Sequence, residues 1–257
     1  MSQVLGRAMD ILDHLSDGPA SLAELSRAFD VHKTTIMRAL HALEERHYVV
    51  RYPDERYHLG RSVFALAAAA MEDRGIQSVA HPHLVQLNRQ VGHTVLLAVL
   101  EGDDVVYVDK IEPRTSVRTP SRVGLPAWLG ATAVAKVLVG SLGPEERQRM
   151  LARVDFTEHA PNTLRTPEQV LATWDEAARR NWAADREEHE KQADYIAVPV
   201  YGLDGAVWAA LSVAAPTAVV SFEELTAQLP LLHEAAQAIS ADLGYRGEVP
   251  APVVGGA

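Results

Sequence analysis

Residues Asp30 to Arg46 read Asp-Val-His-Lys-Thr-Thr-Ile-Met-Arg-Ala-Leu-His-Ala-Leu-Glu-Glu-Arg. Ile36, Leu40 and Leu43 recur at helical spacing in this stretch, so they share one face of a predicted helix. At about 100° per residue, the opposite face carries polar and basic side chains. Such a face can lie in a DNA groove, but an ordinary amphipathic helix with a solvated face has the same pattern. The neighbouring segments favour DNA.

The segment before this helix predicts two further helices. Val4 to Ser16 carries an apolar stripe at helical spacing, and Asp17-Gly18-Pro19 ends it. Ser21 begins Ser-Leu-Ala-Glu, a capping box that opens a second helix ending near Phe29. Two short helices joined by a tight turn are typical of a helix-turn-helix, whose second helix enters the major groove.

The segment after Arg46 predicts a hairpin. Tyr48 to Tyr52 and Arg56 to Leu59 favour strands, and Pro53-Asp54-Glu55 favours the turn between them. Three helices followed by a hairpin indicate a winged helix-turn-helix over residues 1–60. The alternatives are a hairpin that only caps the helices, or a winged helix that binds protein. The expected DNA contacts are His32, Lys33, Thr34, Thr35, Met37, Arg38, His41, Arg51 and Arg56.

Composition limits how such a domain can hold DNA. The 257-residue chain is long enough for two domains, and its formal net charge is −10. Any DNA contact must therefore come from local positive charge on an acidic protein. The absence of cysteine excludes disulfides, thiolate metal sites and cysteine nucleophiles. The sequence shows no basic-then-apolar leader and no apolar run approaching ~20 residues, so we expect a soluble cytoplasmic protein without a membrane partner.

The second part of the chain begins with residues 61–75, whose strong helix formers predict a linker helix. Residues 76–245 then alternate helix and strand signals. Strand pairs turn at Gly102-Asp103-Asp104 and at residues 202–205. An antiparallel sheet of hairpins with flanking helices is an α+β domain. We expect the Pro-, Gly- and Val-rich residues 246–257 to be a disordered tail.

Apolar periodicity and capping signals place the helices of this second domain. We expect one more strand over residues 116–123, and a domain of this kind beside a winged helix usually senses a ligand. The predicted helices cover residues 73–91, 131–142, 144–152, 166–181 and 221–243.

The order and spacing of several motifs resemble the IclR family of bacterial transcription regulators, over residues 4–244. The matching stretches in the first domain are Leu22-Ala-Glu-Leu25, Lys33-Thr-Thr-Ile-Met-Arg-Ala-Leu40 and Tyr57-His-Leu-Gly60. Those in the second include Gly92-His-Thr-Val-Leu-Leu97, Asp185-Arg-Glu-Glu188 and Leu211-Ser-Val213. The resemblance implies a winged-helix domain, a linker helix used in dimerisation and a GAF-like domain that binds a small effector. It also implies homodimers or homotetramers on palindromic double-stranded operator DNA.

The resemblance also implies where the effector binds. The implied effector-binding residues are Ser116, Thr119, Trp128, Ala133, Val134, Asp185, Tyr195, Ser212 and Ala214. Bulky Trp128 and Tyr195 depart from the family pattern, so we expect an organic acid or aromatic metabolite rather than a two- or three-carbon keto acid. From the residues alone, Ser212 is equally compatible with a structural hydrogen bond, and Lys136 with a salt bridge or a surface position.

Other functions are less well supported by the sequence. His81-Pro-His83 cannot bring both rings together on one helical turn, and we find no nucleotide-binding loop, nucleophile elbow or His-Glu-x-x-His motif. A metal-dependent hydrolase could use one acidic stretch, with a solvated loop as the alternative: Asp185, Glu187, Glu188, His189 and Glu190. We expect no cofactor, no metal and no enzymatic activity. We interpret the chain as an effector-responsive transcription regulator, a repressor rather than an activator.

Overall fold

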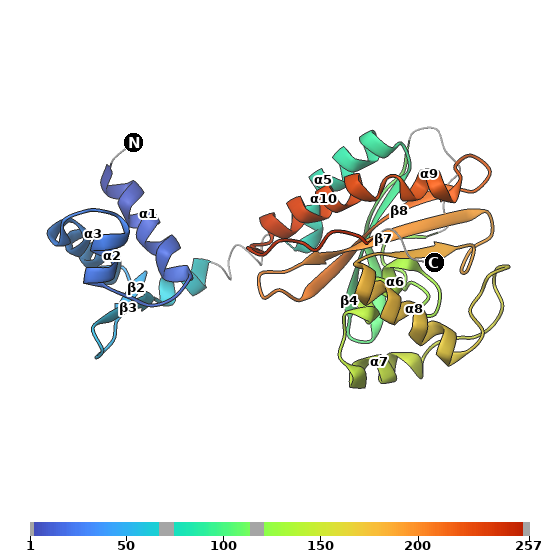
Figure 1. The fold of residues 1–257 in the computed structure, drawn as a ribbon, viewed down its shortest axis with the longest axis horizontal. Helices are drawn as coiled ribbons and strands as arrows, with labels where there is room; N and C mark the ends of the chain where they lie inside the picture. The colour runs from blue at the N-terminus through green and yellow to red at the C-terminus, as the bar shows by residue number, and fades with distance from the viewer. Residues whose placement is uncertain (1–2, 67–74, 114–120, 254–257) are drawn as a thin grey trace. The chain divides into compact units, whose positions relative to one another are not determined.

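The computed structural model describes residues 3–66, 75–113 and 121–253. The chain separates into two compact units, Met1–Gly75 and Ile76–Ala257 (Figure 1). Each unit has its own apolar core. Across the described ranges, no helix is both long enough and apolar enough to span a bilayer.

The first unit consists of three helices and a small antiparallel sheet of order β1-β3-β2. Its elements are α1 (Gln3–Ser16), β1 (Ala20–Ser21), α2 (Leu22–Ala28), α3 (Lys33–Glu45), β2 (Val49–Arg51) and β3 (Arg56–Leu59). Ile11, Leu25, Ile36 and Leu40 are almost completely buried between them. The three predicted helices and the predicted hairpin are therefore confirmed. Residues 61–66 of the expected linker are helical, and its residues 67–74 lie outside the described ranges.

The second unit is built on a five-stranded antiparallel sheet of order β5-β4-β8-β7-β6. Its strands are β4 (Thr94–Glu101), β5 (Asp104–Ile111), β6 (Ala183–Arg186), β7 (Ala193–Tyr201) and β8 (Val207–Pro216). The two predicted hairpins are confirmed as β4–β5 and β7–β8. The central pair, β7 and β8, places Tyr195 opposite Ala214 and Ala197 opposite Ser212.

Helices cover both faces of this sheet (Figure 1). They are α5 (Ile76–Val91), α6 (Ala133–Gly140), α7 (Pro144–Leu151), α8 (Pro167–Arg180), α9 (Phe222–Thr226) and α10 (Leu229–Asp242). Because successive strand residues point to opposite faces, Leu211 and Val213 join the core beneath α5 and α10. Ala210 and Ala214 join the core beneath α6 and α8. The predicted α+β architecture is confirmed.

Two elements differ from the sequence-based expectation. β6 was not predicted because Ala-Ala-Asp-Arg contains no β-branched or aromatic residue; its pairing with β7 holds it extended instead. The single helix expected over residues 221–243 is divided into α9 and α10. Pro230 lies in the first turn of α10, where its missing N–H is tolerated and where it favours a new helix start.

The tail is more ordered than expected. Val249 is 2% exposed, and the Trp182 indole N–H donates to the Val253 carbonyl at 3.0 Å. The Val253 N–H in turn donates to the Arg180 carbonyl at 2.8 Å. These contacts hold residues 249–253 against the second unit, and a composition rich in Pro and Gly gave no sign of them. Most of the strand expected over residues 116–123 lies outside the described ranges.

Candidate DNA-binding surface and effector site

The start of α3 is fixed by a side-chain cap that the sequence pattern did not reveal. His32 is the N-cap residue, and its Nδ1 accepts a hydrogen bond from the Thr34 N–H at 3.4 Å. The same nitrogen lies 2.9 Å from the Thr34 hydroxyl oxygen. The cap satisfies one of the free amides of the first turn, as Ser, Thr, Asp or Asn does more often. His32 and Thr34 are thus oriented by each other.

The polar face of α3 is open to solvent. Ile36, Ala39, Leu40 and Leu43 are buried against the rest of the unit. His41 forms an exposed ion pair with Glu45 at 3.3 Å. The predicted contacts that are exposed here are His32, Lys33, Thr34, Thr35, Met37, Arg38 and His41. The sequence predicted one apolar face and one polar face on this helix, and the structure confirms both.

The two arginines of the hairpin have different environments. Arg51 is exposed, pairs with Glu55 at 2.7 Å and lies over the Tyr57 ring. Arg56 instead bonds to the Pro19 carbonyl through Nε at 3.2 Å, and pairs with Glu24 at 3.2 Å. The sequence predicted a DNA contact at position 56 and gave no sign of these two partners. The Arg56 side chain therefore links β3 to the capping box of α2.

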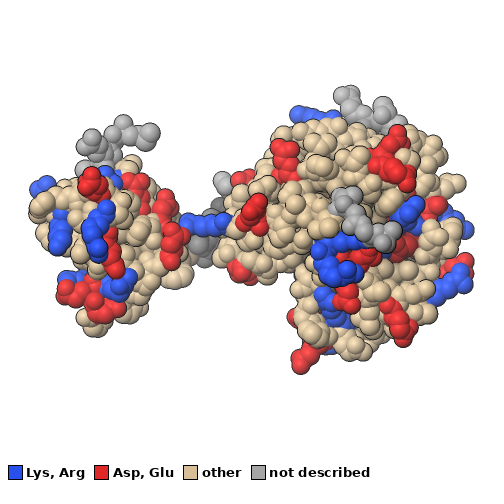
Figure 2. All heavy atoms as spheres, in the orientation of Figure 1, with Lys and Arg blue, Asp and Glu red and all other residues tan. Residues whose placement is uncertain are grey.

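Charge on the visible surface is mixed. Figure 2 shows Lys and Arg side chains lying beside Asp and Glu on both units, without one continuous basic field. This distribution agrees with a formal net charge of −10. Any DNA contact therefore depends on short-range placement of a few cations such as those of α3.

The N-terminus of α6 lacks a side-chain cap. Thr132 stands at the N-cap position, but its hydroxyl donates to the Trp128 carbonyl at 2.9 Å instead of capping the helix. Ala133 and Val134, whose amides were predicted to meet the effector, are the first two residues of the helix and are buried. Unpaired first-turn amides and the helix dipole favour an anionic group.

Asp185 lies on β6 and is 1% exposed. Its Oδ1 accepts hydrogen bonds from the Glu188 N–H at 2.9 Å and the His189 N–H at 3.3 Å. Its Oδ2 is buried without a hydrogen-bond partner among the described residues. Burial raises the pKa of this carboxyl group to about 7, although Lys136 acts against the rise. A buried unsatisfied oxygen is rare in native proteins and needs an explanation, such as a bound water, an ion or a ligand.

Two histidines that the sequence did not single out for the effector lie against Trp128. The Trp128 ring meets the ring of His159 with centroids 3.5 Å apart and that of His189 at 5.3 Å. Nε2 of His159 and Nδ1 of His189 are both buried without a partner in the described part of the chain. Burial lowers the pKa of His189 to about 4, with the charge of His159 adding to the effect. His189 is therefore neutral at pH 7.

Tyr195 of β7 stands opposite Asp185 in the β6–β7 register. The Tyr195 hydroxyl donates to Glu190 Oε2 at 2.6 Å. Burial raises the pKa of Tyr195, and the charge of Glu190 raises it further. Tyr107 of β5 is also buried, and its pKa is raised by burial and by the charges of Asp185 and Glu190. These groups show that β5, β6 and β7 bring polar side chains together beneath α6.

The β8 residues predicted to contact the effector are both buried. The Ser212 hydroxyl donates to the Ile196 carbonyl at 2.8 Å, and Ala214 is 1% exposed beneath α6. Ser212 is thus already satisfied within the sheet. Ser116 and Thr119 lie outside the described residues. Tyr107, His159, His189 and Glu190 were not predicted as effector contacts, because neither spacing nor composition shows that they meet.

Lys136 is a buried salt-bridge residue. Its ammonium contacts both Glu188 carboxylate oxygens at 2.6 Å and donates to the Ala184 carbonyl at 2.7 Å. Of the two possibilities left open by the sequence, the structure selects the salt bridge. Burial raises the pKa of Glu188, and Lys136 opposes that rise.

The acidic stretch and the histidine pair do not converge on a metal. Among the described residues, no group of three or more His, Cys, Asp or Glu side chains is arranged to hold an ion. His81 pairs with Asp109 at 2.7 Å, and His83 with Asp242 at 2.8 Å. The two rings therefore bind separate partners on β5 and α10.

Comparison with known proteins identifies both parts of the chain. The model of the bacterial transcriptional regulator IclR C-terminal domain matches residues 68–241, and that of the HVO_A0261 N-terminal domain matches residues 4–73. The HTH-type transcriptional regulator KdgR of Escherichia coli strain K12 is 32% identical over 225 residues, 87% of this chain and 86% of that protein. The HTH-type transcriptional repressor AllR of the same strain is 29% identical over 250 residues, covering 95% and 92%.

Solved structures share the fold. IclR of Thermotoga maritima has 28% identity and a TM-score of 0.63, covering 95% of this chain and 100% of that one. An IclR homologue from Microbacterium hydrocarbonoxydans, complexed with 4-hydroxybenzoate, has 24% identity and a TM-score of 0.60, covering 94% and 99%.

Proposed function

The chain belongs to the IclR family of bacterial transcriptional regulators, and we propose that it represses transcription by holding operator DNA until a small effector binds. It is a helix-turn-helix regulator with an effector-binding C-terminal domain, and it is not an enzyme. The repressor sense is supported by AllR, which is described as a transcriptional repressor.

The proposed division of labour follows the two units. Residues 1–60 contact DNA, residues 61–75 link, and residues 76–245 bind the effector. α3 is the recognition helix because its polar face is exposed while its apolar face is buried. Arg38 is the central DNA contact, and Arg51 of the hairpin contacts a phosphate of the DNA backbone. Arg56 contributes indirectly by holding the hairpin to α2.

The Oδ2 of Asp185, which has no hydrogen-bond partner within residues 3–66, 75–113 and 121–253, is the observation that supports the effector site most strongly. A ligand hydroxyl or amine would satisfy it, since a carboxylate accepts hydrogen bonds. The first-turn amides of α6, at Ala133 and Val134, have no side-chain cap from Thr132 and suit an anionic end, and the Trp128 ring suits an apolar or aromatic body.

This chemistry favours a small organic acid or an aromatic metabolite. The ligand of the Microbacterium homologue, 4-hydroxybenzoate, combines a carboxylate, a ring and a hydroxyl group. The same three features match the helix amides, Trp128 and Asp185 of this chain. Ligand binding changes operator affinity only if the DNA-competent and DNA-incompetent states bind the ligand differently.

We further propose a homodimer or homotetramer on an operator with two-fold symmetry. Phe64 and Leu66, in the helical segment 61–66, have 70% and 58% of their surface exposed. Large exposed apolar side chains on a short helical segment are well suited to packing against a second copy. A symmetric dimer would then contact two half-sites at a spacing set by the linker.

The proposal is tested with DNA from upstream of the chain's own gene and its neighbours. Wild type should shift one of these fragments in a gel, and a thermal-shift screen of small acids and aromatic metabolites should identify a ligand that releases it. Asp185→Ala should bind the fragment with the same affinity but fail to respond. If Asp185→Ala responds normally, the pocket lies elsewhere.

Ser212→Ala separates a ligand contact from a structural hydrogen bond. Loss of the ligand response with an unchanged melting temperature supports a ligand contact. A lowered melting temperature with a normal response assigns the hydroxyl to the Ile196 carbonyl alone.

A further inference from the structure

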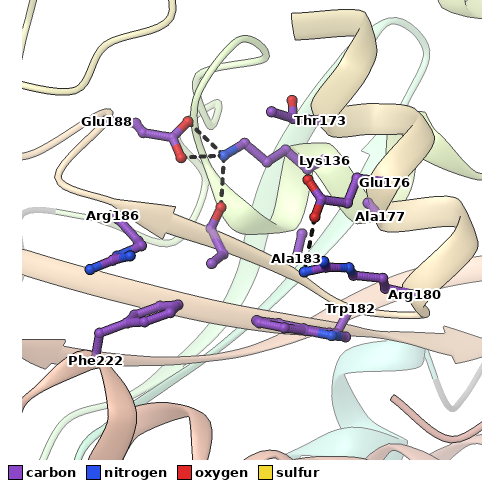
Figure 3. A pocket seen from close by; sticks show the side chains of 11 residues that line it. Lys136, Thr173, Glu176, Ala177, Arg180, Trp182, Ala183, Arg186, Glu188 and Phe222 are labelled. Carbon is purple, nitrogen blue, oxygen red and sulfur yellow. Dashed lines mark hydrogen bonds and ion pairs between the residues drawn. The ribbon is translucent and has the colours of Figure 1, made fainter. Parts of the chain in front are cut away.

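A cavity of about 280 Å³ lies at the free edge of the sheet, beside β6. β6 is the last strand in the sheet order, so it pairs only with β7. The lining comes from α6, α8, β6 and α9, and includes Lys136, Arg180, Trp182, Arg186, Glu188 and Phe222 (Figure 3). None of the predicted effector-binding residues lines this cavity.

Most of the charge in this cavity is neutralised within the protein. Figure 3 shows the Lys136 ammonium held between the Glu188 carboxylate and a backbone carbonyl, that of Ala184. Arg180 pairs with Glu176 at 2.9 Å. Each of these two cations therefore has a carboxylate partner.

Arg186 is different. Its guanidinium lies 4.1 Å from the centroid of the Phe222 ring, and no carboxylate among the described residues forms an ion pair with it. Asp194 stands opposite Arg186 in the β6–β7 register, and the Arg186 charge opposes the rise that burial causes in the pKa of Asp194, but no ion pair joins these two side chains. An exposed guanidinium beside a cavity presents planar N–H donors that match a carboxylate.

The remaining lining suits a flat apolar group. Trp182 and Phe222 contribute aromatic surface, and Ala177, Ala183 and Ala184 leave room beside it. The volume lies just below the roughly 300–1,000 Å³ found for small-molecule pockets. A single ring with one acidic group is therefore the expected size.

We propose that this cavity is a second ligand site, which binds a small aromatic carboxylate through Arg186 and the rings of Phe222 and Trp182. It is separate from the effector site, although Glu188 of its lining also donates its N–H to Asp185. The proposal does not depend on the identity of the effector.

Fluorine NMR of protein labelled with 5-fluorotryptophan can locate a ligand, because the four tryptophans report different places. Trp182 lines the cavity and Trp128 lies at the proposed effector site. Single Trp→Phe variants assign the two resonances. Benzoate is the probe, and benzamide is the neutral control of the same shape.

Benzoate should shift the Trp182 resonance with a dissociation constant in the millimolar range, and benzamide should bind more weakly. Arg186→Gln should raise the benzoate dissociation constant by about tenfold, because a charge-assisted bidentate contact is lost. Arg149→Gln, which removes an exposed arginine of α7, should leave it unchanged. Benzamide binding should be the same in wild type and Arg186→Gln.

Several results would overturn the proposal. One is a Trp182 resonance that benzoate does not move, or moves equally in wild type and Arg186→Gln. If Arg149→Gln weakened benzoate binding as much as Arg186→Gln, the binding would reflect the overall positive charge and not a specific site. A benzoate shift confined to Trp128 would place the probe in the effector site, which would refute the second site while leaving the proposed function intact.

Discussion

Replacing Asp185 by asparagine should stabilise the second unit at neutral and alkaline pH. Asp185 is 1% exposed, and burial raises the pKa of its carboxyl group from 3.8 to about 7. Asparagine keeps an oxygen that can accept the Glu188 and His189 amide hydrogens, but it carries no charge. The substitution therefore removes the cost of burying an ionised carboxylate with little change in shape.

The magnitude follows from proton linkage. Because the folded-state pKa is raised, the contribution of Asp185 to stability is fully present below pH 3.8 and is lost as the pH rises through about 7. Each pKa unit corresponds to about 1.4 kcal/mol, so the ionised carboxylate costs about 4 kcal/mol at alkaline pH. Between about pH 5 and pH 8, the unfolding free energy of wild type should fall by roughly 2.5 kcal/mol relative to Asp185→Asn.

Urea unfolding followed by tryptophan fluorescence measures this difference. All four tryptophans lie in the second unit, so the signal reports that unit: Trp128, Trp174, Trp182 and Trp208. His189 titrates in the opposite sense, because its lowered pKa contributes stability above pH 6.5 that is lost as pH falls through about 4. Both proteins keep His189, so subtracting the two curves cancels its contribution. Asp103→Asn, in the exposed β4–β5 turn, should follow wild type.

A constant difference between wild type and Asp185→Asn across this pH range would refute the reasoning. An unfolding free energy of wild type that rises relative to that of Asp185→Asn with increasing pH would refute it as well. Either result would mean that the carboxylate is solvated or paired in the folded protein.

Three further predictions follow from the site geometry. Arg38→Ala should weaken operator binding without unfolding the first unit. In gel-shift titrations at several salt concentrations, loss of a phosphate contact lowers the slope of affinity against salt by about one, whereas loss of a base contact relaxes sequence specificity at one operator position. Unchanged operator affinity would show that Arg38 is not in the interface. Lys136→Met leaves Glu188 buried without its partner and should lower the free energy of unfolding in urea by about 3 kcal/mol. The double variant Lys136→Met/Glu188→Gln should recover most of this loss. A double variant no more stable than the single one would contradict the expectation. Light scattering should find a dimer or larger assembly at micromolar concentration, and a monomer that still binds specific DNA would contradict the proposed symmetry.

The sequence predicted the elements whose signals are local. The apolar stripe of Ile36, Leu40 and Leu43, the capping box at Ser21 and the two hairpin turns each depend on residues a few positions apart. Periodicity and capping chemistry specify such elements directly. β6 escaped prediction because its extended backbone depends on pairing with β7 and not on its own residues.

The candidate site was only partly predictable for the same reason. Asp185 and Trp128 were identified through the family resemblance, but the contacts of His159 and His189 with Trp128 join segments far apart in the chain. No spacing rule shows such a meeting. Arg56 shows the same limit, because the sequence did not reveal that its guanidinium contacts Pro19 and Glu24; its contact with DNA stays a prediction.

We propose that operator and effector bind the same molecule and that each changes the affinity of the other by one coupling free energy. The most direct test measures both affinities with the ligand found by thermal shift: the operator dissociation constant with and without ligand, and the ligand dissociation constant with and without operator. Linkage requires the two ratios to be equal, and we expect a factor of about 5 to 150 in wild type. Asp185→Ala should bind operator normally with a ratio near one. A ligand that binds tightly while leaving operator affinity unchanged would contradict the account.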